Sequence, residues 1–215
     1  MNENLPKVRR TFYSVVVKRA LDILLSGIAL VMLSPLLLII CVLELIFHGW
    51  PVVFVQKRPG LNGEIFHMYK FRSMTNETDE NGNLLPGSQR VTKFGKFIRR
   101  FSIDELPELF CILSGKMSII GPRALMPEYL ELYSPRHMMR HAVKPGLACV
   151  PLKPMKTWTW NDQFENDLYY VEHVSFKLDV QMVAAMVKEA VKGSEYRTGD
   201  TRGKFTGENL NQSAS

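Results

Sequence analysis

The feature that most constrains this chain is a run of 21 residues without a charged side chain, from Ile23 to Leu43. As a helix that rises 1.5 Å per residue, the run would extend roughly 31 Å, which matches the hydrocarbon core of a bilayer. It has no polar face, so a helix packed inside a soluble domain is disfavoured. It lies too far into the chain for a cleavable signal peptide, and no small-residue cleavage site follows it. The run therefore predicts a membrane segment.

Pro35 lies just past the middle of this run and bears on how the segment meets the membrane. It lacks the N–H that would bond to Val31, and its ring clashes with the preceding turn, so a kink is expected. The Ser34 hydroxyl can satisfy part of the freed backbone. Each half of the run then has about 12 residues, which is too few to cross a bilayer alone. Ser34 and Pro35 are thus the predicted break of the membrane segment.

Basic residues flank the run on both sides. They are Lys7, Arg9, Arg10, Lys18 and Arg19 before it, and Lys57, Arg58, Lys70 and Arg72 after it. A spanning helix would place everything after Glu44 outside the cell, whereas a helix that bends back at the break keeps both basic flanks in the cytoplasm. From these residues alone, a spanning and a re-entrant segment have similar support.

Outside the run, the composition is that of an ordinary soluble domain. Of the 215 residues, 46% are hydrophobic and 22% are charged, which excludes a polytopic membrane protein, a disordered chain and a collagen-like repeat. The net charge of +6 predicts an anionic partner: nucleic acid, a phospholipid surface or a phosphorylated small molecule. Nucleic acid is the weakest of these, because the chain has no known binding motif. The three cysteines fit neither a zinc site nor a disulfide framework, so reduced thiols are expected.

The patterns along the chain divide it into four parts. Residues 1–17 form a basic leader, 18–48 the membrane segment, 49–193 one domain, and 194–215 a polar tail that is expected to be disordered. The domain is predicted to be mixed α/β and mostly helical. Residues 52–56 and 65–71 predict a small β-hairpin, and the polar stretch 75–89 predicts a mobile loop. Helices are expected at 106–113, 127–142 and 176–191.

Residues 92–101 combine aromatic and basic side chains at helical spacing. Four apolar side chains fall on one face, and four basic ones occupy other positions: Phe94, Phe97, Ile98 and Phe101, with Lys93, Lys96, Arg99 and Arg100. This pattern is typical of a helix that lies in a membrane interface. A surface helix that turns its aromatic face to the core of the domain is an equal alternative.

Asp104 and Glu105 are adjacent carboxylates at the predicted start of a helix. Pro107 fits best as the third helical residue, which makes Asp104 the N-cap. In a purely structural interpretation, Asp104 caps the helix and Glu105 interacts favourably with its dipole. In a functional interpretation, the helix start binds a phosphate, one carboxylate attacks phosphorus, and its neighbour holds Mg²⁺.

Other polar residues are weaker candidates on their own. Arg123, which follows Gly121 and Pro122, is either a bidentate phosphate ligand or an exposed arginine in a turn. The same two interpretations apply to Lys70, Arg72, Arg99 and Arg100. His137 and His141 lie four residues apart on a predicted helix, which is a weak sign of a metal pair. The chain has no Walker A loop, no dinucleotide-binding glycine motif and no zinc-protease motif.

Taken together, the chain resembles the monotopic phosphoglycosyl transferases, also called bacterial sugar transferases, from about Lys18 to Lys192. Each of the shared tracts is moderately specific, and their order and spacing are strongly so. The tracts are K-R-x-x-D at 18–22, S-P at 34–35, Q-K-R-P-G at 56–60, Y-K-F-R-S-M at 69–74, S-I-D-E-L-P at 102–107, G-K-M-S-I-I-G-P-R at 115–123 and D-L-Y-Y at 167–170.

The resemblance implies a re-entrant membrane helix and a compact catalytic domain that faces the cytoplasm at the bacterial inner membrane. It implies transfer of a phosphosugar from a nucleotide diphosphate sugar, expected to be a UDP-sugar, to polyprenol phosphate, with release of UMP. By position, Asp104 would be the nucleophile, Glu105 would bind Mg²⁺, and Pro122 and Arg123 would meet the phosphate. The expected partners are these two substrates and the phospholipids of the membrane, and the product would initiate membrane-linked glycan assembly.

The chain departs from the family pattern after Pro145 and Gly146. There the family usually has a W-Q-V-x-G-R-like stretch, whereas residues 147–156 of this chain are L-A-C-V-P-L-K-P-M-K. Lys153 or Lys156 is expected to replace the missing cation, and Ala124 stands where a second proline is common. Two alternatives follow: a family homologue with an altered donor or acceptor lipid, or a non-catalytic, membrane-anchored interaction protein in which Asp104 only caps a helix.

Overall fold

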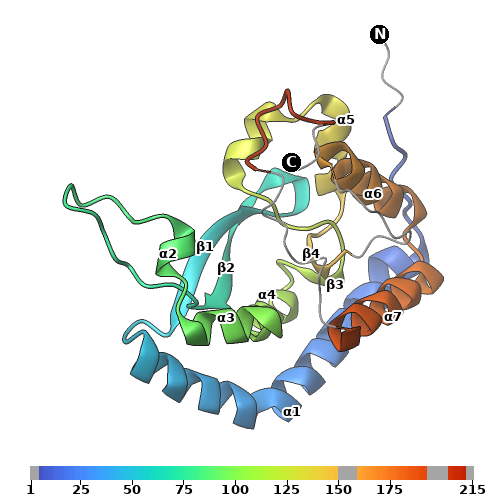
Figure 1. Ribbon diagram of the computed structural model, residues 1–215. Helices are drawn as coiled ribbons and strands as arrows, with labels where there is room; N and C mark the ends of the chain where they lie inside the picture. Colours follow the sequence, from blue (N-terminus) through green and yellow to red (C-terminus); the bar gives the residue numbers. More distant parts are fainter. Residues whose placement is uncertain (1–4, 150–158, 193–202, 212–215) are drawn as a thin grey trace.

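The computed structural model describes residues 5–149, 159–192 and 203–211 (Figure 1). The fold is mixed α/β and mostly helical, as the sequence predicts, with one long apolar helix near the N-terminus. In chain order the elements are α1 (Lys18–Phe47), β1 (Val53–Pro59), β2 (Ile65–Phe71), α2 (Gly87–Arg90), α3 (Lys93–Arg100), α4 (Glu108–Leu113), β3 (Ser118–Ile120), α5 (Pro135–Met138), β4 (Gly146–Ala148), α6 (Trp160–His173) and α7 (Phe176–Lys192).

Helix α1 is bent midway along its length, and both of its ends return to the rest of the domain (Figure 1). Pro35 lies inside the helix, as predicted from the sequence. The Ser34 hydroxyl donates a hydrogen bond to the Val31 carbonyl at 2.8 Å, and this is the carbonyl that Pro35 leaves without its helical N–H donor. Val31 and Met32, next to the bend, are each 75% exposed. A five-residue π-helical turn, Tyr13–Val17, runs directly into α1.

The predicted hairpin is present, and it is longer than the sequence pattern suggested. Strands β1 and β2 pair antiparallel, from Val53 opposite Phe71 to Pro59 opposite Ile65. Lys57 and Arg58 therefore belong to the strand, and the turn is a short 3-10 helix at Leu61–Gly63. Within the predicted loop 75–89, the structure adds the short helix α2.

Helix α3 turns part of its apolar face to the core and leaves the rest exposed. Thr92 caps it by accepting a hydrogen bond from the Gly95 N–H at 2.8 Å. Ile98 is fully buried in a cluster with Ile40, Val52 and Phe71, against which Phe94 also packs, whereas Phe97 and Phe101 are more than half exposed. Gly95 is required here, because a Cβ at this position would lie 2.0 Å from the Ser73 carbonyl oxygen.

Between β3 and β4 the helical structure is divided into shorter pieces than the sequence predicted. The expected helix 127–142 consists of three short pieces: a 3-10 helix at Pro127–Leu132, α5, and a second 3-10 helix at Met139–Ala142. Pro135 explains the break, because a proline is tolerated in the first turn of a helix and not in its interior. Ser134 caps α5 by accepting from the His137 N–H. Strands β3 and β4 pair in parallel.

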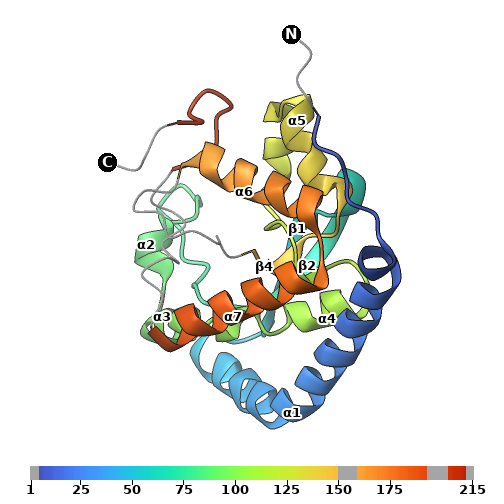
Figure 2. The same ribbon diagram turned by 90° about the vertical axis from the view of Figure 1, so that its right-hand side faces the viewer.

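Helices α6 and α7 lie one above the other on one side of the molecule, with α1 below them (Figure 2). The sequence predicted α7 and missed α6, which begins with a capping box formed by Thr159 and Asp162. Residues 203–211, which fall in the tail predicted to be disordered, are packed against the domain. Phe205 is 3% exposed among aromatic side chains of the preceding elements, which are Tyr129, Tyr133, Trp160 and Phe164.

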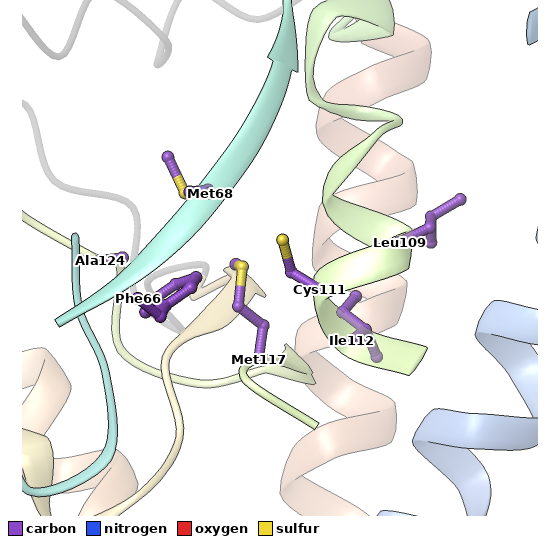
Figure 3. Packing of buried hydrophobic residues seen from close by; sticks show 7 residues of the cluster. All are labelled: Phe66, Met68, Leu109, Cys111, Ile112, Met117 and Ala124. Atoms are coloured by element: carbon purple, nitrogen blue, oxygen red, sulfur yellow. The ribbon is translucent and has the colours of Figure 1, made fainter. Parts of the chain in front are cut away.

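The main core lies between β2, α4 and the first half of α1 (Figure 3). Its buried members are Phe66, Met68, Leu109, Cys111, Ile112, Met117 and Ala124. Ala29, Leu30 and Leu33 of α1 pack against this cluster, so the first half of this apolar helix is part of the fold of the domain. All three cysteines are free thiols, as the sequence predicts.

Candidate functional site

Asp104 lies in a short 3-10 helix, Ile103–Glu105, and is 9% exposed. The prediction that it is an N-cap is wrong. The turn starts after Ser102, whose φ of 57° is in the left-handed region, and α4 begins only at Glu108, preceded by Pro107. Helix α4 has only six residues and does not start at Asp104. A phosphate bound near Asp104 would therefore be held by charged side chains and not by the start of a helix.

The Lys70 ammonium, on β2, joins two carboxylates that follow Asp104 in the chain. Its Nζ lies 3.0 Å from Glu105 Oε1 and 3.0 Å from Glu108 Oε1. Arg123 Nη2 lies 3.4 Å from the same Glu105 oxygen. The structure thus brings together three of the predicted site residues, Lys70, Glu105 and Arg123, and it adds Glu108.

Glu108 is the functional candidate that the sequence analysis missed most clearly. It follows Glu105 by three residues, a spacing that places two side chains on the same face of a helical turn, and this signal was available in the sequence. Its side chain is 5% exposed. Burial raises the pKa of this carboxyl to about 7, and the nearby Lys70 ammonium offsets only part of that rise.

We expect Glu108→Gln to change how stability depends on pH. Because the folded pKa of Glu108, about 7, lies above its usual value of 4.5, the folded state holds a proton that the unfolded chain has lost between these pH values. The proton on Glu108 stabilises the folded wild-type chain at low pH, and this contribution is lost as pH rises from 4.5 through 7. The glutamine variant has no such loss. Over this pH range, the free energy of unfolding of the variant should rise by about 3 kcal/mol relative to that of the wild-type chain, at about 1.4 kcal/mol per pKa unit.

Thermal unfolding of both chains in lipid nanodiscs at pH 5 and pH 8 measures this difference. Glu80→Gln is the matched control, because Glu80 is exposed in the loop between β2 and α2. A Glu108→Gln variant whose midpoint follows that of the wild-type chain at both pH values would contradict the raised pKa.

Arg58 is a second residue that the sequence analysis did not assign to the site. Its guanidinium donates to Gln56 Oε1 at 2.8 Å, while its Nε is buried and has no hydrogen-bond partner among the described residues. Burial and the nearby positive charge of Arg123 lower the pKa of Arg58. Two guanidinium groups placed close together favour an anion between them, and planar guanidinium donors match phosphate oxygens.

These groups surround a small cavity with a volume of about 30 Å³, enough for a water molecule or an ion. Its lining residues are Arg58, Met68, Lys70, Glu105, Glu108, Met117, Arg123, Ala124, Gly146 and Leu147. The two glycines of the G-P-R and P-G tracts shape one wall, because a Cβ on Gly146 would lie 2.1 Å from the Gly121 nitrogen. Only glycines allow the two segments to approach this closely.

A buried ion pair fixes the backbone that carries Arg123. Arg140 Nη2 donates to the Arg123 carbonyl at 2.7 Å and to Asp167 Oδ2 at 2.6 Å. Asp167 is fully buried on α6, and Gln163 Nε2 also donates to it, at 2.9 Å. The D-L-Y-Y tract therefore acts on the site from a distance, as a support for Arg123.

The remaining predicted phosphate ligands do not line this cavity. Arg99 is exposed on α3. Pro122 is buried, and its carbonyl accepts a hydrogen bond from the Gly146 N–H at 3.0 Å. Lys153 and Lys156 lie outside the described residues.

The histidine pair is structural. His141 Nδ1 lies 3.1 Å from the Gly60 carbonyl oxygen, and burial, together with the neighbouring Arg140, lowers its pKa to about 4. His137 stacks on Phe164 at a ring distance of 4.5 Å. In the ranges that the structure describes, no group of three or more His, Cys, Asp or Glu side chains could hold a metal.

The domain thus combines a cavity lined by three basic side chains, Arg58, Lys70 and Arg123, with an apolar helix long enough to cross a membrane. Residues 13–193 match the family described as "Bacterial sugar transferase", and the chain therefore belongs to this family of transferases.

Several curated proteins are similar to the chain. The uncharacterized sugar transferase EpsL of Bacillus subtilis is 39% identical over 196 residues, which cover 90% of this chain and 97% of that protein. The UDP-N-acetylgalactosamine-undecaprenyl-phosphate N-acetylgalactosaminephosphotransferase of Aeromonas hydrophila is 36% identical over 82% of this chain and 44% of its own length. The UDP-glucose:undecaprenyl-phosphate glucose-1-phosphate transferase of Escherichia coli is 35% identical over 77% of this chain and 38% of its own length. The chain thus spans less than half of the last two proteins.

Proposed function

We propose that this chain transfers a sugar phosphate from a nucleotide diphosphate sugar to polyprenol phosphate. The observation that carries the proposal is the convergence of Lys70, Arg58 and Arg123 on one cavity that is also lined by Glu105, the residue that follows Asp104 in the chain, and by Glu108. Three cations around one small cavity suit the oxygens of a phosphate group at its mouth, whose charge must be held during transfer. The names of the related proteins from Aeromonas hydrophila and Escherichia coli support a UDP-sugar as donor and undecaprenyl phosphate as acceptor.

In the proposed reaction, the Asp104 carboxylate attacks the phosphorus that bears the sugar. A bond forms between the carboxylate oxygen and this phosphorus, and the bond from phosphorus to the bridging oxygen breaks, so that UMP leaves with the electron pair. The phosphate oxygen of the polyprenol then attacks the same phosphorus, which releases the Asp104 carboxylate and yields a polyprenol diphosphate sugar. Arg58 and Arg123 would hold the non-bridging oxygens during both steps.

We propose that Glu105 and Glu108 would hold a Mg²⁺ ion during this reaction. Glu105 and Glu108 each place a carboxylate oxygen 3.0 Å from one point, which Lys70 Nζ now holds, so a cation already lies between them. Mg²⁺ prefers one or two carboxylates together with phosphate oxygens and water. When bound there, the ion would neutralise charge on the diphosphate, and Lys70 would turn toward the substrate. We expect omission of Mg²⁺ to abolish turnover.

We further propose that α1 is re-entrant and that the domain lies on the cytoplasmic face of the inner membrane. Both ends of the helix are hydrogen-bonded to the same domain. At the first end, Arg19 donates to the Ile112 and Leu113 carbonyls at 2.6 and 2.8 Å. At the far end, His48 Nε2 lies 2.9 Å from the Thr92 hydroxyl.

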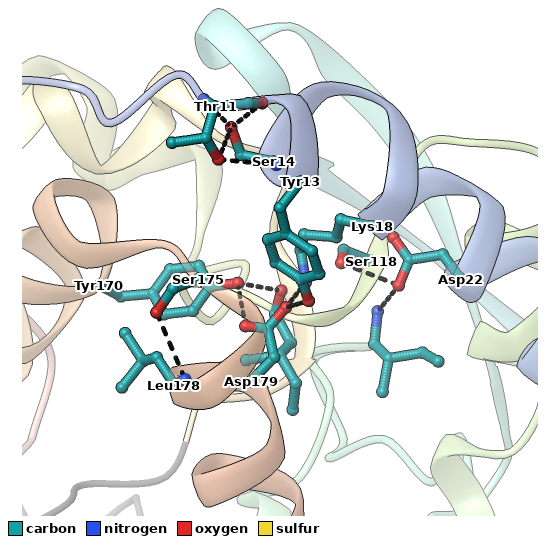
Figure 4. Close-up of polar contacts among 12 residues, drawn as sticks. Thr11, Tyr13, Ser14, Lys18, Asp22, Ser118, Tyr170, Ser175, Leu178 and Asp179 are labelled. Carbon is teal, nitrogen blue, oxygen red and sulfur yellow. Dashed lines mark hydrogen bonds and ion pairs between the residues drawn. The ribbon is translucent and has the colours of Figure 1, made fainter.

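Asp179 on α7 adds a second attachment of the first end (Figure 4). It accepts hydrogen bonds from the Tyr13 hydroxyl at 2.6 Å and from Lys18 Nζ at 2.7 Å, and on its other oxygen from the Tyr170 hydroxyl at 2.7 Å. A helix whose two ends are both attached to one domain cannot place its ends on opposite sides of a membrane without pulling that domain through it.

Accessibility of the two flanks tests the topology. We expect Leu5→Cys and Leu61→Cys, both exposed positions, to react with a membrane-impermeant maleimide from the same side of the membrane. Right-side-out and inverted vesicles provide the two sides, and the unsubstituted chain reports the reaction of its own cysteines. Reaction of the two introduced cysteines from opposite sides would show a spanning helix.

A donor screen tests the function. The full chain, in nanodiscs that contain undecaprenyl phosphate, is supplied with a series of nucleotide diphosphate sugars and Mg²⁺, and release of nucleoside monophosphate is measured. The proposal expects at least one donor to give release that depends on the acceptor lipid. The altered stretch at residues 147–156 makes an unusual sugar a main target of the screen. A chain that releases no monophosphate from any donor would favour the alternative of a non-catalytic interaction protein.

A further inference from the structure

A second cavity lies beside the hairpin turn and the end of α4, with a volume of about 220 Å³. It shares no lining residue with the cavity at Glu105. Two lysines, Lys116 and Lys144, contribute ammonium groups to it, and three apolar side chains line the same space. The full lining is Gly60, Leu61, Glu64, Ile65, Phe66, Gly115, Lys116 and Lys144.

Arg19, at the start of α1, adds a third positive charge next to this cavity. A Cβ on Gly115 would lie 3.1 Å from Arg19 Nη2 and 3.6 Å from Lys144 Nζ, so these two cations approach the same point of the chain. The hydrogen bonds of Arg19 to two carbonyls at the end of α4 hold its guanidinium in place. Gly115, with a φ of +85°, is the residue whose missing side chain leaves room for them.

The nearby carboxylates are engaged elsewhere or face solvent. Asp22 is 4% exposed and accepts hydrogen bonds from the Ser118 hydroxyl and the Ile119 N–H, at 3.1 and 3.0 Å. Glu64 is exposed on the rim. Over residues 5–149, 159–192 and 203–211, neither lysine has a carboxylate oxygen within ion-pair distance. The two lysines therefore have no ion-pair partner in the described part of the chain, and the Asp22 charge acts on Lys144 only from beyond ion-pair distance.

The electrostatic surroundings of Lys144 also favour a bound anion. Burial, and then the positive charge of Arg19, lower its pKa; the negative charge of Asp22 offsets part of this fall, and Lys116 adds slightly to it. A cation that is partly buried beside other cations is destabilised, and a bound anion would relieve that cost.

We propose that this cavity, the Lys116–Lys144 pocket, binds the phosphate group of a phosphate ester. Ammonium and guanidinium groups offer only donors, which suits the acceptor oxygens of phosphate. The apolar wall formed by Leu61, Ile65 and Phe66 would contact the organic part of the ester. Because Arg19 belongs to the first turns of the membrane helix, the pocket lies near the end of that helix, where anionic head groups concentrate.

The test measures binding to the full chain in phosphatidylcholine nanodiscs, with two probes in separate arms. One arm raises the fraction of phosphatidylglycerol, and the other adds inorganic pyrophosphate. Lys116→Gln with Lys144→Gln removes the two ammonium groups, and Lys57→Gln with Lys204→Gln removes the same charge at exposed positions outside the pocket. We expect the first pair to weaken binding of at least one probe by about tenfold or more, and the second pair to leave it unchanged.

Each outcome decides the proposal. A loss in the phosphatidylglycerol arm identifies the phosphate of a lipid head group, and a loss in the pyrophosphate arm identifies a soluble phosphate or diphosphate group. Binding that the Lys116 and Lys144 substitutions leave intact, binding that the control pair weakens equally, or no binding in either arm would overturn it. Pyrophosphate binding that is lost only with Arg123→Gln belongs to the cavity at Glu105 and also counts against the pocket. The readout is binding, so it stands apart from turnover at Asp104.

Discussion

Replacing Asp104 with asparagine is expected to lower the release of nucleoside monophosphate by about 10⁴-fold or more, the order of effect of removing an enzyme nucleophile. An amide oxygen carries no negative charge and cannot form the acyl phosphate that the proposed reaction requires. The substitution nearly preserves the size and shape of a side chain that is 9% exposed, so the fold should persist. Release of UMP, or of the monophosphate found in the donor screen, measures the effect.

Asp79→Asn is the matched control for this variant. Asp79 is exposed, and its carboxylate accepts hydrogen bonds from the Asn81 and Asn83 N–H groups within the loop after β2. The same change there should leave turnover within about twofold, since surface substitutions away from special features have small effects.

Covalent labelling separates a nucleophile from a residue that only shapes the site. With the donor and without acceptor lipid, the wild-type chain should gain the mass of one sugar phosphate, and the Asp104→Asn chain should gain none. An asparagine variant that still turns over at the wild-type rate, or that still gains this mass, would exclude Asp104 as the nucleophile.

Local patterns in the sequence predicted the parts of the fold that depend on neighbours along the chain. The break in α1 follows from one missing N–H at Pro35 and one hydroxyl at Ser34, and the structure shows the Ser34 hydroxyl on the Val31 carbonyl. The hairpin, α3 and α7 likewise follow from spacings within a few residues. Such elements can be predicted because their hydrogen bonds close locally.

The site was predictable only in part, because its geometry depends on contacts between distant segments. Lys70 and Glu105 are 35 residues apart, and nothing local indicates that they share an ion pair. The capping prediction for Asp104 was wrong because a 3-10 turn already starts at Ile103, directly after the left-handed Ser102; Asp104 lies inside this turn, and α4 begins only at Glu108. Arg58 was not assigned to the site from the sequence, and the structure places it on β1 and in the lining of the same cavity as Arg123.

The second large effect is expected at the buried pair of Arg140 and Asp167, through which α6 holds the backbone at Arg123. We expect Asp167→Asn to lower the free energy of unfolding by about 3–5 kcal/mol, because it leaves the buried charge of Arg140 without its counter-charge. Arg140 is 1% exposed and Asp167 is fully buried, so water cannot replace the lost carboxylate. Thermal or denaturant unfolding in nanodiscs measures the loss.

Glu165→Gln is the matched control, on the same helix and two residues away. Glu165 pairs with Arg136 at 2.8 Å, but both side chains are largely accessible, at 45% and 32%. An exposed pair of this kind contributes about 0–1 kcal/mol. Equal losses in the Glu165 and Asp167 variants would show that burial does not govern the strength of these pairs.

A double substitution separates stability from positioning. Arg140→Met with Asp167→Leu replaces the pair by apolar side chains of similar size, which is often neutral for stability when a buried ion pair is removed. It also removes the hydrogen bond from Arg140 to the Arg123 carbonyl. If the pair positions Arg123, this variant should recover most of the stability lost in Asp167→Asn and should still turn over slowly. We expect kcat to be lowered more than KM is raised, because a misplaced guanidinium stabilises the phosphate less, chiefly in the transition state. Full recovery of both stability and kcat would show that Asp167 supports the fold alone and that Arg123 keeps its place without it.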